Sequence, residues 1–138
     1  MSDFVSTVDS IGDEALTSSI IDRSITEILD NYAKRINGYA FYGCSALTTV
    51  NFSAVTSIDN YAFSSCSALT VLILRSTTMA TLSNTGVFNN TPIASGTGYI
   101  YVPAALVDSY KAASNWSTYA NQIRAIEDYP EICGGETA

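Results

Sequence analysis

The chain has 138 residues, of which 47% are hydrophobic, and it carries a formal net charge of −7. This length suits a single domain, and the hydrophobic content is too high for a disordered chain. The acidic balance disfavours binding to nucleic acid or to anionic lipid surfaces. No apolar run approaches the ~18 residues that predict membrane insertion.

The N-terminal third, residues 1–35, is rich in acidic side chains and lacks the charged-then-apolar pattern of a secretory signal peptide. We expect it to form a cap on the rest of the domain, or a segment for attachment and oligomerisation. Ser24 to Ile28 favours a first strand. A helix also remains open for residues 20–35, because a helical stripe fits Ile21, Ile25, Ile28 and Tyr32.

The middle of the chain repeats itself with a period of 22 residues. The stretch YAFYGCSALTTV, from Tyr39 to Val50, recurs as YAFSSCSALTVL from Tyr61 to Leu72. A fixed period of this length is typical of a solenoid, in which equivalent residues of successive coils stack in columns. The core positions of the repeat are Ile36, Phe41, Cys44, Leu47, Ile58, Phe63, Cys66 and Leu69.

Each copy predicts one short strand. LTTVNF and LTVLIL alternate apolar and polar positions, and such a strand buries its apolar side by pairing in parallel with the strand of the next copy. YAFYGC and YAFSSC would form the return side, as short helical or 3-10 turns whose aromatic rings fill the interior.

A third, degenerate copy follows and extends the repeats over residues 36–102. Leu82 takes the place of Ile58, Phe88 that of Phe63, and Thr91 that of the cysteine, and YIYV provides the strand. The inserted residues 75–98 are either a plain connector or a binding loop, since insertions in solenoids map to loops.

Several polar and aromatic side chains are candidates for a ligand surface, because exposed aromatic rings beside amides are common in sugar-binding and protein-binding patches. Tyr39 and Tyr61 recur with the repeat and are interpreted as structural. For Tyr99 and Tyr101, both a core position and a ligand-facing position remain open. The candidate set is Tyr42, Asn84, Asn89, Asn90, Tyr99 and Tyr101.

Residues 103–127 predict a C-terminal cap, because the open end of a solenoid must be covered. Pro103 suits the first position of a helix. Trp116 and Tyr119 would cover the end of the core, and IRAI would return as a last strand. Residues 128–138 are expected to be a disordered tail with an exposed Cys133.

The repeat resembles the BspA-like leucine-rich repeats, with equivalent matches in the next copy to Ile36, Ala40, Phe41, Cys44, Leu47 and Val50. The closing segment from Ile100 to Ile126 is similar to the end of such proteins in gut Firmicutes and their phages, and SIIDRSITEI is similar to the lead-in of short phage or prophage members. The resemblance implies an α/β fold: a short right-handed leucine-rich-repeat solenoid with parallel strands, short helical return segments and a C-terminal capping helix.

Catalytic chemistry has little support. The chain has no histidine, no GxSxG or phosphate-binding motif, and only Asp59 as a carboxylate within the repeats. We therefore expect no enzyme, no catalytic residue, no cofactor and no metal. Cys44 and Cys66 could form a thiol pair on adjacent coils, but a buried column is favoured because the position recurs with the fold.

The combined hypothesis is a non-enzymatic module for recognition or assembly. The first version is a phage or prophage structural protein, a fibre or tip that displays the repeat surface to a host glycan or protein. Its partners would be that ligand, other virion proteins, or itself as a homo-oligomer, in a virion or at an extracellular surface. The alternative is a bacterial surface or secreted adhesin that acts as a monomer.

Overall fold

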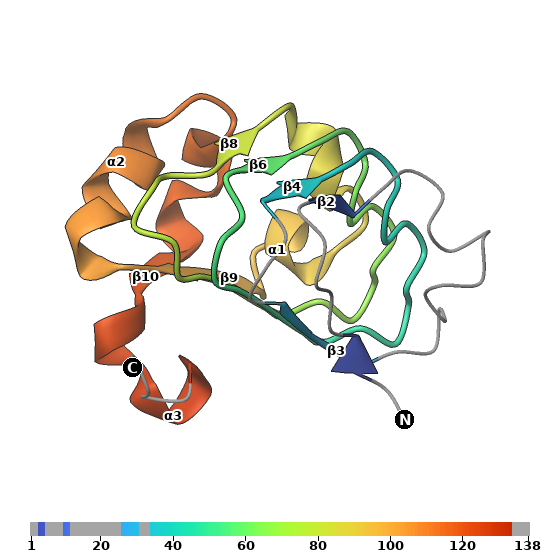
Figure 1. Ribbon diagram of the computed structural model, residues 1–138, viewed down its shortest axis with the longest axis horizontal. Coiled ribbons are helices and arrows are strands. Elements are labelled where there is room, and N and C mark those ends of the chain that lie inside the picture. Colours follow the sequence, from blue (N-terminus) through green and yellow to red (C-terminus); the bar gives the residue numbers. More distant parts are fainter. Residues whose placement is uncertain (1–2, 5–9, 12–25, 31–33, 134–138) are drawn as a thin grey trace.

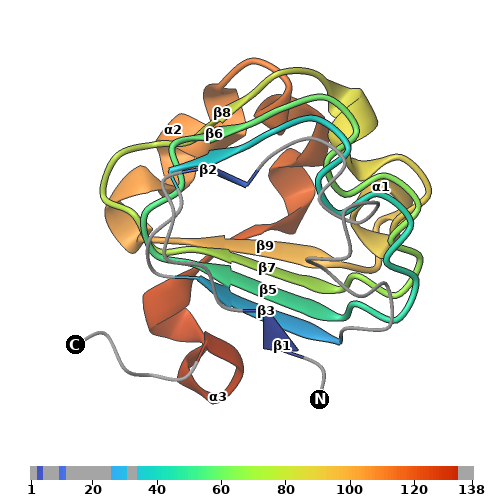
Figure 2. The same ribbon diagram turned by 45° about the vertical axis from the view of Figure 1, so that its right-hand side comes forward.

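In the computed structural model, which describes residues 3–4, 10–11, 26–30 and 34–133, the chain coils between two parallel sheets (Figures 1 and 2). Each coil adds one strand to each sheet. The larger sheet consists, in spatial order, of β1 (Asp3–Phe4), β3 (Glu27–Asp30), β5 (Thr49–Phe52), β7 (Val71–Leu74), β9 (Tyr99–Val102) and β10 (Ile123–Ala125). The smaller consists of β2 (Ser10–Ile11), β4 (Arg35–Ile36), β6 (Ser57–Ile58) and β8 (Thr81–Leu82). The expected α/β solenoid of parallel strands is confirmed.

Strand register follows the sequence repeat. Val50 pairs with Leu72 and Ile36 with Ile58, each at an offset of 22 residues. The third copy is longer, so 24 residues separate Ile58 from its partner Leu82. The pairing stays in phase because the extra residues lie in the connections and not in the strands. Leu82 therefore occupies the predicted place in the column.

The core lies between the sheets and is built from the predicted columns, all of whose members are buried. Phe41, Phe63 and Phe88 stack nearly parallel, with ring centroids 5.4 and 6.3 Å apart. Burying each ring contributes about 1.5–3 kcal/mol. Because each coil stacks on the next, this column joins all three copies into one core.

The return side of the first two copies is a run of β-turns, and the expected helical form is found in the third copy. There, η1 (Thr85–Phe88) and α1 (Pro92–Ser95) form the return. In the first copy, the amides of Ala40 and Tyr42 bond within the turn, while the amide of Phe41 donates to Ala62 of the next coil. Backbone groups on this side are thus shared between turn and neighbouring coil.

One expectation for the return side was wrong: not all of its aromatic rings fill the interior. Phe41 and Phe63 do, but Tyr39 is 49% exposed. Tyr39 and Tyr61 both have positive φ angles, 61° and 57°, which interrupt any helical turn. In the alternating run of turns, successive side chains face opposite ways, so the tyrosines point outward while the phenylalanines point inward.

The C-terminal cap forms as predicted, from η2 (Ala104–Leu106), α2 (Val107–Ala112), η3 (Trp116–Gln122) and β10. Pro103 precedes η2 and does not occupy its first position. Trp116 and Tyr119 are buried and pack their rings against Phe88. The Trp116 indole donates to the Ala80 carbonyl at 2.8 Å, so the cap also satisfies a backbone group at the open end of the last coil.

The segment after the cap is partly ordered, so the expected exposure of Cys133 was wrong. η4 (Ile126–Asp128) and α3 (Pro130–Cys133) follow β10, and Cys133 is only 2% exposed. Figure 2 shows α3 on the outer side of the larger sheet. The thiol is buried there because it packs with apolar side chains that the sheet presents on that side. Residues 134–138 lie outside the described residues.

In the N-terminal third, residues 27–30 form strand β3, which pairs in parallel with β5. The predicted strand beginning at Ser24 therefore starts at Glu27, and residues 20–25 lie outside the described residues. The two-residue strands β1 and β2 pair with β3 and β4. The role of residues 1–35 as a cap or attachment segment stays a prediction.

Candidate functional site

The outer face of the larger sheet is covered at one end by the chain itself. In one row across the strands, Ile73 and Tyr101 are 1% and 3% exposed, whereas Leu29 is 45% exposed. Ile126 and Cys133 form a small cluster with Ile73 and Tyr101. Tyr101, a candidate ligand residue, therefore lies in this second core, and burial raises the pKa of its hydroxyl.

Polar contacts hold this covering segment in place. The Arg75 side chain donates to the Asn51 side chain at 3.0 Å and to the Cys133 carbonyl. The other candidate on this face, Tyr99, is partly buried, with the Arg124 guanidinium 4.7 Å from its ring centroid. The half of the face near β9 is therefore occupied, and open surface remains near Leu29.

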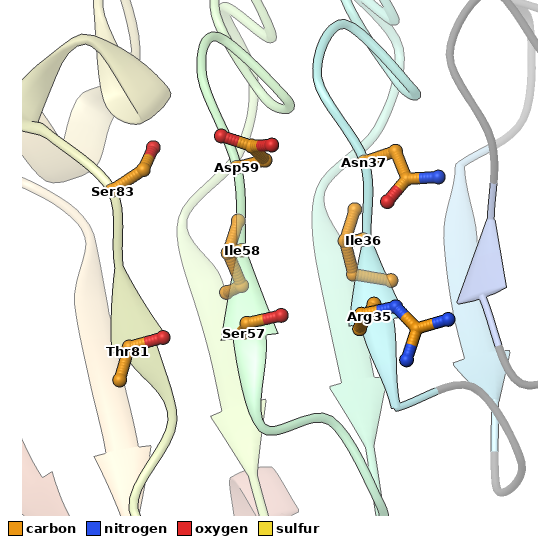
Figure 3. Close-up of a pocket in the computed structure, with 8 residues that line it drawn as sticks. All are labelled: Arg35, Ile36, Asn37, Ser57, Ile58, Asp59, Thr81 and Ser83. Atoms are coloured by element: carbon orange, nitrogen blue, oxygen red, sulfur yellow. The ribbon is translucent and has the colours of Figure 1, made fainter.

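The outer face of the smaller sheet carries a groove that the sequence did not predict (Figure 3). We call it the polar groove, and its volume is about 170 Å³. Figure 3 shows two rows of polar side chains that run across β4, β6 and β8. The groove is lined by Arg35, Ile36, Asn37, Ser57, Ile58, Asp59, Thr81 and Ser83.

Strand alternation explains this lining. Ile36 and Ile58 are 1% exposed because they point into the core, so their neighbours along the chain face outward. Parallel register then aligns Arg35, Ser57 and Thr81 in one row, about 4.8 Å apart from strand to strand. The second row, two residues further along each strand, holds an amide, a carboxylate and a hydroxyl.

Hydrogen bonds fix the rim of the polar groove next to Asp59. The Asn60 side-chain oxygen accepts from the Ser83 hydroxyl at 2.8 Å and from the Asn84 amide at 2.7 Å. Asn84 also accepts from the Gly86 backbone at 2.8 Å and so caps η1. The candidate Asn84 thus belongs to this rim, and it holds the beginning of η1 against the neighbouring coil.

Tyr39, Tyr42 and Tyr61 form an exposed cluster beyond the groove, which we call the tyrosine ladder. The Tyr39 ring lies 5.3 Å from that of Tyr61 and 5.5 Å from that of Tyr42, which is 40% exposed. Across the coils, the Tyr39 amide donates to the Asn60 carbonyl. The candidate Tyr42 and the recurring Tyr39 therefore share one surface, adjacent to the rim.

The remaining candidates, Asn89 and Asn90, are exposed in the turn before α1. Asn90 has a φ angle of 61°, and the equivalent positions in the earlier copies, Gly43 and Ser65, have positive φ as well. Asparagine tolerates this conformation better than most residues. The sequence therefore has a conformational reason for Asn90, and the structure separates this pair from the groove lining.

The two repeat cysteines form the expected buried column, and both thiols are free. The Cys66 thiol donates to the Phe41 carbonyl at 3.2 Å. The hydrogen bond with Cys44, together with burial, raises the pKa of Cys66 far above its ordinary value. Within the described residues, no group of three or more histidine, cysteine or acidic side chains lies close enough to hold a metal ion.

Comparison with known proteins identifies the family. Residues 2–102 match the model of the BspA type leucine-rich repeat region, so the chain belongs to this family. Leucine-rich repeats of this type are interaction and adhesion modules, generally without enzymatic activity, and are typically found at surfaces or outside the cell. No curated protein matches the chain. Among the described residues, no helix is long and apolar enough to cross a membrane.

Proposed function

We propose that this protein recognises a host-surface glycan or protein through its repeat surface, without catalysis. The observation that carries the proposal is the polar groove, which is built from positions that recur at each coil. Its side chains are hydroxyls and an amide with one charge of each sign, Arg35 and Asp59. Such groups bind by hydrogen bonding, and rigid parallel strands hold them in fixed positions.

We further propose that the protein is a structural component of a phage or prophage particle, a fibre or tip that acts as a homo-oligomer. The similarity of its first and last segments to those of phage members supports this role. Leu29 also supports it, because an exposed leucine on the open part of the larger sheet is suited to contact with a second copy or another virion protein. The location would then be the virion.

Adsorption to cells tests the recognition function. Fluorescently labelled full-length chain is mixed with intact cells of a panel of gut Firmicutes, and the bound fraction is measured by flow cytometry. Saturable binding to some strains is expected. Loss of binding after periodate treatment of the cells identifies a glycan, and loss after protease treatment identifies a protein. Absence of saturable binding to every strain would refute the proposal.

The alternative is a bacterial surface or secreted adhesin that acts as a monomer. The typical location of the family favours it. Size-exclusion chromatography with light scattering, on the full chain under reducing conditions, separates the two versions. A closed oligomer is expected for the fibre or tip, and a monomer of 14.7 kDa for the adhesin. The full chain is needed because a version that starts at Ile36 would lack β1 and β3 and expose the edge of β5.

A further inference from the structure

We propose that the polar groove binds one neutral pyranose unit of a glycan, and that the tyrosine ladder contacts the next unit. This inference rests on the proposed recognition function and names the ligand class and its place. Three properties of the site lead to it: the volume of the groove, the chemistry of its side chains and the position of the exposed rings.

The volume limits the size of the ligand. The polar groove encloses about 170 Å³, which is below the roughly 300 Å³ at which sites for drug-sized molecules begin. A single sugar ring is small enough for this space. The groove opens to solvent along the outer face of the sheet (Figure 3), so a glycan can continue beyond the bound unit.

The side chains match sugar hydroxyls, each of which both donates and accepts hydrogen bonds. The hydroxyls of Ser57, Thr81 and Ser83 do the same. Arg35 and Asp59 contribute opposite charges, so neither a phosphate nor a cationic peptide gains from the net charge of the groove. A neutral, hydroxyl-rich ligand is therefore favoured over both.

The acceptor at Asp59 is already oriented. One of its carboxylate oxygens accepts from the Asn60 amide at 2.7 Å. Among the described residues, the other oxygen accepts no recorded hydrogen bond. Ser83, across the groove, is fixed through Asn60. Because these groups are held before binding, little conformational entropy is lost when a sugar hydroxyl meets them.

The tyrosine ladder lies next to this end of the groove. Asn60, which follows Asp59 in the chain, accepts from the Tyr39 backbone amide at 3.0 Å. Tyr39 and Tyr42 are 49% and 40% exposed, and tyrosine presents an apolar ring with a polar tip. The apolar face of a second sugar unit can pack on these rings while its hydroxyls stay in water.

The test is a ¹⁵N–¹H NMR titration of the full chain with four probes: the methyl glycosides of glucose, galactose, mannose and N-acetylglucosamine. At least one probe is expected to bind saturably, with a dissociation constant on the order of 1 mM, and to shift amide signals of residues 35–37, 57–59 and 81–83. Shifts confined to other residues, or no saturable shift with any probe, would overturn the inference.

A matched pair of variants locates the site. Asp59→Asn keeps an oxygen that can accept from the Asn60 amide but removes the charge, and is expected to weaken probe binding about tenfold. Asp108→Asn makes the same change at an exposed residue of α2 and is expected to leave binding unchanged. Equal binding by wild type and Asp59→Asn would refute this site. Failure of all four probes beside protease-sensitive binding to cells would refute the glycan while leaving the recognition function in place.

Discussion

Replacing Phe63 with alanine removes the middle ring of the column that joins the three copies. Phe63 is fully buried and stacks on Phe41 and Phe88, with a third ring, Phe52, 6.1 Å away. Truncating a buried phenylalanine costs about 3–5 kcal/mol in the free energy of unfolding, and each aromatic contact adds about 0.5–1.5 kcal/mol. We expect a loss of about 4–5 kcal/mol, a large part of the roughly 5–15 kcal/mol typical of a domain.

Urea unfolding measures this loss through the fluorescence of Trp116, the chain's single tryptophan, which packs against Phe88 at the end of the same core. Tyr42→Ala is the control, because Tyr42 is 40% exposed and its truncation is expected to change stability by less than about 0.5 kcal/mol. If Phe63→Ala costs less than about 1 kcal/mol, or no more than Tyr42→Ala, the column does not join the copies as described.

Three further predictions concern the turn, the tyrosines and the thiols. An added Cβ at Gly86 would lie 2.8 Å from the Tyr61 ring, so Gly86→Ala is expected to cost about 1–2 kcal/mol in urea unfolding. The cost should fall by at least about 0.5 kcal/mol in a Tyr61→Asn background, and strict additivity would contradict the contact. Burial raises the pKa of Tyr101, Tyr110 and Tyr119, so the unfolded chain ionises first on the alkaline side. Stability should therefore be independent of these groups below about pH 10 and fall as the pH rises above it; thermal melts at about pH 8 and about pH 11 check this, and equal midpoints would contradict it. Under native conditions, iodoacetamide followed by mass spectrometry should modify Cys133 before Cys44 and Cys66. The short α3 can open locally, whereas the repeat cysteines become accessible only on global unfolding, so equal rates would contradict the buried column.

The repeat made the columns predictable, because residues 22 positions apart carry the same side-chain type from Ile36 to Leu72. The register of the larger sheet follows directly from that alignment. The cap was predictable for a similar reason: Trp116 and Tyr119 are large apolar residues placed just after the last strand, where an open core needs covering.

The smaller sheet was not predictable from local pattern, because its strands are two residues long and two residues show no periodicity. The polar groove depends on that sheet. Its lining comes from three coils, and each coil supplies ordinary polar residues such as Ser57 and Thr81 that carry no motif.

Other misses have non-local or conformational causes. Tyr101 alternates on its strand as a surface residue would, but a segment from beyond the cap covers it. The exposure of Tyr39 follows from its positive φ angle, which the amino-acid type does not reveal, since tyrosine seldom adopts it.

The measurement that tests the central claim most directly is adsorption to cells by a variant with a blocked groove. Ser57 lies at the centre of the polar groove on the middle strand, so Ser57→Trp fills the space while leaving the inward-facing Ile58 in place. Ser45→Trp, at an exposed turn residue outside the groove lining, adds the same side chain as a control. Recognition through the groove predicts that Ser57→Trp abolishes saturable adsorption while Ser45→Trp adsorbs like the wild type. Undiminished adsorption by a folded Ser57→Trp variant would contradict the account.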